Sequence, residues 1–135
     1  MFQIASYETF QDGQIIFEEG FHGDWIYIVE QGEVEISKKV DGQKIVVEVL
    51  KEDDIFGEIA YIDKAPRSAT ATAKGTTVVG IMDRDFFDAE FNKLSADFQV
   101  ILKTVALRLR KATERLAALQ HEKSEALHCQ GEACR

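Results

Sequence analysis

Apolar and polar residues alternate in short runs between residues 7 and 83, and glycines separate these runs at intervals of about ten residues. In the run 45–49, for example, Val47 falls on one side of the predicted strand and Glu48 on the other. A period of two with one polar face is typical of antiparallel sheet. Many short strands divided by glycine turns are typical of sandwiches and barrels. The pattern therefore predicts a mainly β domain.

Three local signals add detail to this pattern. Asp41 and Gly42 lie between two alternating runs and predict a β-hairpin turn. Residues 57–63 break the strand period and predict one or two helical turns. Asp83 then predicts the N-cap of a short helix that ends near Asn92.

A long helix is predicted from Ser95, because neither proline nor glycine interrupts residues 95–130. From Ser95 to Leu127 it would be about 50 Å long, which exceeds the width of a small domain. Its apolar residues repeat at spacings of four and three, which is a coiled-coil seam; they are Phe98, Leu102, Val105, Leu109, Ala112, Leu116 and Leu119. This seam predicts a homodimer through the long helix. The alternative is an amphipathic helix that lies on its own sheet.

These patterns divide the chain into a β domain with a short helix at 1–94, a dimerisation helix at 95–128 and a disordered tail at 129–135. Both cysteines, Cys129 and Cys134, lie in that tail, so we expect no disulfide framework in the domain. No apolar segment approaches the roughly 20 residues that cross a bilayer, and no signal-peptide pattern is present. The sequence thus predicts a cytoplasmic protein without membrane contact.

Charge is distributed unevenly along the chain. Residues 1–100 hold 20 acidic and 9 basic side chains, whereas residues 101–135 hold 4 acidic and 7 basic ones. An acidic body argues against a nucleic-acid-binding surface, which needs clustered lysine and arginine. The basic side chains of the long helix are expected to be solvated flanks, some paired with acidic groups of the domain; they are Lys103, Arg108, Arg110, Lys111 and Arg115.

Patterns for catalysis or metal binding are weak. His22 is the only histidine of the β region, whereas a cupin-type enzyme would need several His and Glu ligands on neighbouring strands. His121 and His128 lie in the helix or tail, so no Ser-His-Asp or Cys-His set is apparent. The spacing of these histidines and the two cysteines matches no common zinc pattern. We therefore predict a non-catalytic domain without a metal.

The residues from 56 to 70 carry the strongest functional signal. Gly57 lets the backbone approach a ligand closely. The helix start after it exposes backbone N–H groups, among them those of Ile59 and Ala60, which can hold a phosphate. This arrangement predicts an anion site at the turn.

Three side chains of the same stretch suit a nucleotide. Arg67 offers a planar guanidinium that can bind two phosphate oxygens, and Ser68 adds a hydroxyl. Glu58 has only acceptors when it is ionised, so it suits a ribose hydroxyl and not the phosphate. The alternative for these residues is a surface turn with a Glu–Arg ion pair and no ligand.

Residues 56–60, Phe-Gly-Glu-Ile-Ala, and 66–70, Pro-Arg-Ser-Ala-Thr, resemble the phosphate-binding cassette of the cyclic nucleotide-binding domain family. That family includes protein kinase regulatory subunits, gated channels and catabolite-activator-type transcription regulators. The likeness extends from about Glu8 to Leu119, and the long helix resembles the dimerisation helix of the bacterial regulators. The resemblance implies an antiparallel double-stranded β-roll, which is jelly-roll-like, with a short phosphate-binding helix and a long C-terminal helix.

The resemblance also implies roles for single residues. Arg67 would neutralise a cyclic phosphate, and Glu58 would accept a hydrogen bond from the ribose 2′-hydroxyl. The other predicted ligand-binding residues are Phe56, Gly57, Ile59, Ala60, Ser68 and Ala69 of the cassette, Val47 and Ile36 as walls for the base, and Thr113 as the hydroxyl that reads it. Cyclic AMP is favoured over cyclic GMP as the ligand.

The chain departs from the family pattern in three ways. Tyr61 stands where the family usually has leucine, the usual N-terminal helices are mostly absent, and no helix-turn-helix or channel follows the long helix. We therefore predict a free-standing sensor that changes its helix arrangement on ligand binding and acts on an unidentified protein effector. The alternative is a dimeric interaction scaffold with a vestigial pocket.

Overall fold

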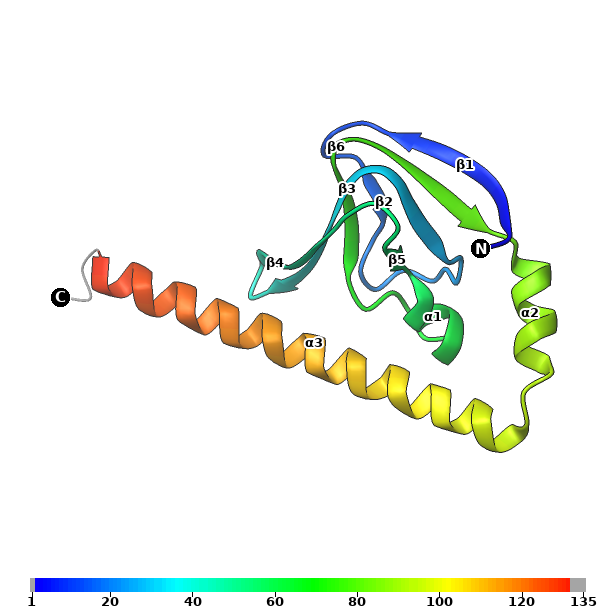
Figure 1. Ribbon diagram of the computed structural model, residues 1–135. Coiled ribbons are helices and arrows are strands. Elements are labelled where there is room, and N and C mark those ends of the chain that lie inside the picture. The colour runs from blue at the N-terminus through cyan, green and yellow to red at the C-terminus, as the bar shows by residue number, and fades with distance from the viewer. Residues whose placement is uncertain (1, 132–135) are drawn as a thin grey trace.

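The computed structural model describes the backbone of residues 2–131 and the side chains of residues 2–127 (Figure 1). In chain order the elements are β1 Ile4–Phe10, β2 Ile15–Phe17, β3 Tyr27–Val40, β4 Gln43–Leu50, β5 Ile55–Phe56, α1 Glu58–Asp63, β6 Thr70–Met82, α2 Arg84–Asn92 and α3 Ala96–Gly131. The predicted class, mainly β with helices at the C-terminus, is confirmed.

The strands form one antiparallel sheet in the order β1-β6-β3-β4, with β2 paired to β6 and β5 paired to β3. Pairing between β3 and β6 runs from Tyr27↔Ile81 to Ser37↔Thr70, and its register shifts on either side of Gln31. Such irregularities bend and twist a strand. The sheet consequently rolls up without closing, and α1 and α3 lie along the mouth of the roll (Figure 1).

The core fills the inside of this roll. Three valines of β3 and β6 have no exposed surface; they are Val29, Val34 and Val79. Beside them the rings of Phe17, Tyr27 and Phe56 pack with centroids 5.1 to 5.9 Å apart. This aromatic group joins β2, β3 and β5, and so fixes the strand that leads directly into α1.

The local signals in the sequence produce the predicted structures. Asp41 and Gly42, with φ of 52° and 80°, form a two-residue turn between the paired Val40 and Gln43. Both φ values are positive, as the hairpin turns that match strand twist require. The Asp83 side chain accepts a hydrogen bond of 3.2 Å from the N–H of Phe86 and caps α2. Helix α1 lies within the predicted segment 57–63.

Helix α3 presents different sides to the domain and to the surroundings. Ala106 and Ala117 are buried against the domain. Along the predicted seam, in contrast, Val105, Leu109 and Leu116 are 48%, 51% and 43% exposed. Most of the seam is therefore left uncovered by the helix's own domain, although Leu102 is half-buried and Leu116 borders a cavity of the domain.

The end of α3 differs from the predicted end. The helix continues to Gly131, whereas the sequence placed its end near residue 128 and a disordered tail at 129–135. Residues 132–135 of that tail lie outside the described residues. Residues 129–131 form the last part of the helix, which ends at a glycine, a common residue at helix C-termini.

Candidate functional site

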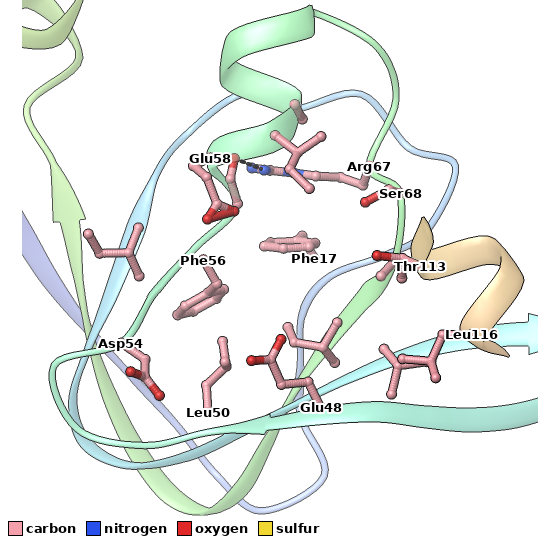
Figure 2. A pocket seen from close by; sticks show the side chains of 17 residues that line it. Phe17, Glu48, Leu50, Asp54, Phe56, Glu58, Arg67, Ser68, Thr113 and Leu116 are labelled. Atoms are coloured by element: carbon pink, nitrogen blue, oxygen red, sulfur yellow. Dashed lines mark hydrogen bonds between the residues drawn. The ribbon is translucent and has the colours of Figure 1, made fainter. Parts of the chain in front are cut away.

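A cavity of about 320 Å³ lies between the β-roll, the start of α1 and the side of α3 (Figure 2). Every residue predicted to bind ligand lines it: Ile36, Val47, Phe56, Gly57, Glu58, Ile59, Ala60, Arg67, Ser68, Ala69 and Thr113. Six further residues complete the lining; they are Phe17, Glu48, Leu50, Asp54, Ile55 and Leu116. The fold thus places the predicted residues around one space, although their roles toward a ligand stay predictions.

Arg67 is a buried cation at one end of this cavity, with only 4% of its surface exposed. Its guanidinium donates hydrogen bonds of 2.9 Å to the carbonyls of Gly57 and Trp25, and lies 4.1 Å from the centroid of the Phe17 ring. Burial lowers the pKa of Arg67, but an arginine keeps its charge in proteins.

Among the described residues Arg67 forms no ion pair within 4.0 Å, and its buried Nε has no hydrogen-bond partner. The Glu58–Arg67 pair of the surface-turn alternative is therefore not formed. A buried charge without a counterion is costly unless it meets an opposite charge. The site is thus prepared for a small anion.

Gly57 fits tightly against Arg67. Its φ is 83°, and a Cβ built there would lie 2.8 Å from the Trp25 carbonyl oxygen and 2.9 Å from Nη1 of Arg67. Any side chain would displace the arginine or the backbone. Gly57 is also the N-cap of α1 and supplies no side-chain hydrogen bond, so the first turn has no side-chain cap.

Lys38 holds the backbone at Ser68, the residue that follows Arg67. Although it is buried, it donates a hydrogen bond to the carbonyl of Ser68 and pairs with Glu19 at 3.0 Å. The Glu19 N–H in turn bonds to the Thr70 hydroxyl at 2.9 Å. These contacts hold Ser68 in place, and the Lys38 charge is already balanced. Lys38 carries no signal in the sequence, since its partners Glu19 and Ser68 are remote from it along the chain.

Glu58 and Glu48 are two carboxylates of the cavity wall. Burial raises the pKa of Glu58, and the nearby Glu48 charge adds to this shift; hydrogen bonding from the backbone N–H groups of Glu58 and Ile59 opposes it, as Arg67 does to a smaller extent. An ionised Glu58 would accept hydrogen bonds from a ligand. Strand alternation predicted that Glu48 faces away from Val47, and this prediction is wrong: both side chains line the cavity. The cause is an irregularity in the pairing of β3 with β4.

Helix α3 closes the cavity with Thr113 and Leu116 (Figure 2). The Thr113 hydroxyl donates a hydrogen bond of 2.9 Å to the Leu109 carbonyl one turn earlier. Its lone pairs can still accept a hydrogen bond from a ligand. To donate a hydrogen bond to a ligand, the Thr113 hydroxyl would first have to break its bond to the Leu109 carbonyl.

Two polar links join the cassette to the helices. Arg110 of α3 binds Asp63 with bonds of 2.9 and 3.0 Å and the Pro66 carbonyl with one of 2.7 Å. The prediction that basic groups of α3 pair with acidic groups of the domain is confirmed at this pair.

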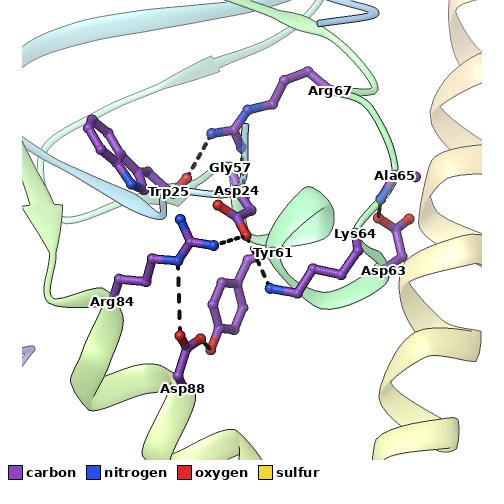
Figure 3. Close-up of polar contacts among 10 residues, drawn as sticks. All are labelled: Asp24, Trp25, Gly57, Tyr61, Asp63, Lys64, Ala65, Arg67, Arg84 and Asp88. Atoms are coloured by element: carbon purple, nitrogen blue, oxygen red, sulfur yellow. Dashed lines mark hydrogen bonds and ion pairs between the residues drawn. The ribbon is translucent and has the colours of Figure 1, made fainter. Parts of the chain in front are cut away.

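The second link joins α1 to α2. The Tyr61 hydroxyl donates a 2.7 Å hydrogen bond to Asp88 of α2, so that tyrosine adds a contact that the usual leucine of the family could not form (Figure 3). Burial and then Asp88 raise the pKa of Tyr61.

Asp24 joins the same two helices from the segment before β3 (Figure 3). Its carboxylate lies 2.8 Å from Nη2 of Arg84 at the start of α2 and 3.2 Å from Nζ of Lys64 at the end of α1. Both bases are half-exposed, so each pair contributes only about 0–1 kcal/mol of stability. Asp24 directly precedes Trp25, whose carbonyl accepts a hydrogen bond from Arg67. Its ion pairs therefore matter mainly because they hold this segment in place beside α1 and α2.

The residues considered for metal binding do not come together in the described part of the chain. No group of three or more His, Cys, Asp and Glu side chains is placed to hold a metal ion there. His22 is exposed, and Nε2 of His121 lies 3.2 Å from Asp41. The side chains of His128, Cys129 and Cys134 lie outside the described residues. Separately, no helix in the described range is long and apolar enough to span a membrane.

A family model for the cyclic nucleotide-binding domain matches residues 7–93, which is more than half of the chain. This match contains most of the roll, the cassette and α2, whereas α3, which adds Thr113 and Leu116 to the cavity, lies beyond it. The chain belongs to the cyclic nucleotide-binding domain family. The resemblance drawn from the cassette residues is thereby confirmed.

Two of the similar curated proteins are regulators. The cAMP-dependent protein kinase regulatory subunit of Yarrowia lipolytica is 41% identical over 80 residues, which cover 59% of this chain and 21% of the relative. The CRP-like cAMP-activated global transcriptional regulator of Mycobacterium tuberculosis is 32% identical over 111 residues, which cover 82% of this chain and 50% of the relative. The matched region is at most half the length of these two relatives.

Solved structures share the fold. The cAMP-bound form of the EAL enzyme Bd1971 matches 93% of this chain and 33% of its own, with a TM-score of 0.76 and 31% identity. The cGMP-bound form of that enzyme matches 78% of this chain and 28% of its own, with a TM-score of 0.73 and 32% identity. A cyclic nucleotide-binding β-roll with C-terminal helices is thus the fold of this protein.

Proposed function

We propose that this protein binds a cyclic nucleotide in the cavity of Figure 2 and acts as a non-catalytic sensor. One observation carries the proposal: Arg67 is a buried guanidinium at the cavity wall with no anion partner among the described residues. A cyclic phosphate has one negative charge and two free oxygens, which suit one guanidinium. Membership of the family and the cAMP-bound neighbours support this choice.

We propose one orientation of the ligand in the cavity, based on the residues that line it. Its phosphate lies at Arg67, Ser68 and the backbone of Gly57 to Ala60, and its ribose 2′-hydroxyl donates to Glu58. The base then occupies the space between Val47 and Thr113. The residues predicted as walls and the one predicted as base reader all border that space.

Cyclic AMP is the ligand that we propose. Both similar regulators are described as responding to or dependent on cAMP, and the enzyme neighbour was solved with cAMP as well as with cGMP. Membership of the family therefore does not decide between adenine and guanine, and any selectivity must come from this chain's own residues. We also propose that the protein resides in the cytoplasm.

The signal leaves the cavity through the polar links to the helices. Ligand phosphate would compete with the Gly57 and Trp25 carbonyls for Arg67, and both belong to segments that contact α1 or α2. Tyr61–Asp88 and Arg110–Asp63 then transmit a change in the cassette to α2 and α3. A ligand shifts such an equilibrium only if it contacts the two states differently.

Dimerisation through α3 completes the sensor. The seam residues Val105, Leu109 and Leu116 are exposed although they are apolar, and a second copy would cover them as a coiled coil does. The same exposed seam also favours the second candidate, a dimeric scaffold with a vestigial pocket that docks a protein partner. Arg67 separates the two candidates, since only the sensor needs it.

Isothermal titration calorimetry of protein stripped of co-purified ligand tests the proposal. We expect cyclic AMP to bind once per chain with micromolar or tighter affinity, and more tightly than cyclic GMP. Arg67→Ala should weaken this binding by about 100-fold or more, because the phosphate loses its counterion. Absence of binding by either nucleotide would favour the scaffold.

A further inference from the structure

Glu48 reaches the cavity because β4 contains a bulge. Ile36 of β3 pairs with Glu48, but the next residue, Ser37, pairs with Val46, so that Val47 is an extra residue in β4. In a regular strand Val47 and Glu48 would point to opposite faces. The bulge places both side chains on the cavity. Bulges of this kind are frequent beside functional sites, where they redirect a side chain.

Glu48 lies in the part of the cavity that the sugar-phosphate leaves free. Figure 2 shows its carboxylate rising from β4 into the cavity on the side away from Arg67. Around it the walls are mainly apolar, with Val47 and Leu50 from the same strand and Leu116 from α3. A flat heterocycle between these walls would present its edge to the carboxylate.

The carboxylate of Glu48 is not used elsewhere in the structure. Within residues 2–127 it forms no hydrogen bond and no ion pair. The other acid on this side of the cavity, Asp54, already accepts a 2.9 Å bond from the Lys51 N–H and so closes a turn. An unpaired negative charge beside an anion-binding site disfavours an anionic ligand unless that ligand brings a donor.

We propose that the Glu48 carboxylate accepts a hydrogen bond from an exocyclic amino group of a purine base and thereby selects the ligand. This inference rests on the proposed function. Ionised carboxylates offer only acceptors, and hydrogen bonds to charged groups are roughly twice as strong as neutral ones. A base with a carbonyl or a bare ring carbon at that place forfeits this bond.

Two pairs of cyclic nucleotides isolate the amino group. Cyclic AMP and purine riboside cyclic monophosphate differ by the 6-amino group, and cyclic GMP and cyclic IMP differ by the 2-amino group. All four are titrated calorimetrically into the parent protein, Glu48→Met and Glu48→Gln. Glu52→Met is the matched control, because Glu52 is exposed in the turn after β4 and does not line the cavity.

In one of the two pairs, we expect the parent to bind the amino-bearing member about tenfold more tightly or better. Glu48→Met should bring that ratio close to one and leave the affinity for the amino-free member unchanged or higher. Glu48→Gln keeps a neutral acceptor and should give an intermediate ratio, while Glu52→Met keeps the parent ratio. The pair that responds identifies the base.

Two results would overturn the inference while nucleotide binding stands. One is a Glu48→Met variant in which both members of each pair change by the same factor, since Glu48 would then act only through its charge or through cavity shape. The other is a parent protein that shows no preference within either pair. If the parent binds none of the four nucleotides, the proposed function fails, and the inference falls with it.

Discussion

Arg110 of α3 binds Asp63 at the end of α1 through two hydrogen bonds of 2.9 and 3.0 Å. Both side chains are nearly buried, with 15% and 12% of their surface exposed. The third bond of Arg110, to the Pro66 carbonyl, reaches the residue before Arg67. One side chain thus ties the long helix to both ends of the stretch 63–66, which connects α1 to Arg67.

Replacing Arg110 should therefore destabilise the protein and uncouple α3. Arg110→Met leaves the nearly buried Asp63 carboxylate without a counterion and with only the Ala65 N–H as a partner, at a cost of about 3 kcal/mol of unfolding free energy. Urea denaturation measures this cost, and a double-mutant cycle with Asp63→Asn isolates the pair. Arg108→Met, an exposed arginine of the same helix, is the control and should change little. Equal effects of the two variants would contradict the link.

Gly57→Ala tests the close approach of the backbone to Arg67. The added Cβ would lie 2.9 Å from Nη1 of Arg67, and the φ of 83° adds strain. We expect a loss of about 2–4 kcal/mol in stability and a large loss of nucleotide affinity. Gly42→Ala is the matched control, because Gly42 has a φ of 80° with nothing within 4 Å of its Cβ.

Gly42→Ala should show only the backbone strain, about 1–2 kcal/mol, with nucleotide affinity unchanged. Thermal unfolding and calorimetric titration of both variants separate strain from crowding. If Gly57→Ala retained the parent affinity, the tight fit against Arg67 would be irrelevant to binding.

The raised pKa of Glu58 predicts a pH dependence of stability. Burial, the main cause, favours the neutral form in the folded state, so the folded pKa lies above the unfolded value of about 4.5. Protonated Glu58 therefore contributes its full stabilising free energy below the unfolded pKa, and this contribution is lost as the pH rises through the folded pKa. Glu58→Gln should consequently unfold at a higher temperature than the parent at about pH 7, and at the same temperature at about pH 4.

Nucleotide affinity should respond to Glu58→Gln in the opposite direction. At about pH 7 the variant loses a charged acceptor for the ribose hydroxyl, so it should bind cyclic AMP about tenfold more weakly while being more stable. Calorimetry and thermal unfolding on the same samples check both parts. A variant that is less stable than the parent at about pH 7 would show that another interaction dominates at Glu58.

The exposed seam of α3 predicts the oligomeric state. Leu109→Arg places a charge at the centre of the seam, where Leu109 is 51% exposed in the single chain, and should convert a dimer to a monomer. Leu107→Arg is the control, because Leu107 is 46% exposed on a different side of the helix. Sedimentation velocity distinguishes the two species. A parent protein that sediments as a monomer would refute the dimer.

Much of the site could be predicted because the cassette is local in sequence. Gly57, Glu58 and Arg67 lie within eleven successive positions, and the chemistry of each follows from its residue type and the turn it occupies. Glu48 and Lys38 could not be predicted in this way. Glu48 depends on a bulge that strand alternation does not show, and Lys38 depends on contacts with Glu19 and Ser68, which lie in turns remote in sequence.

The sequence by itself determined the mainly β class, the hairpin turn, the helix caps and the cassette, because each arises from contacts or φ preferences within a few residues. Only the tertiary structure decided that Ile36, Val47 and Thr113 border the same cavity as Arg67. It also decided which side of α3 the domain covers and which side it leaves exposed. These features depend on register, bulges and long-range ion pairs, which minimise the free energy of the whole chain and not of any one segment.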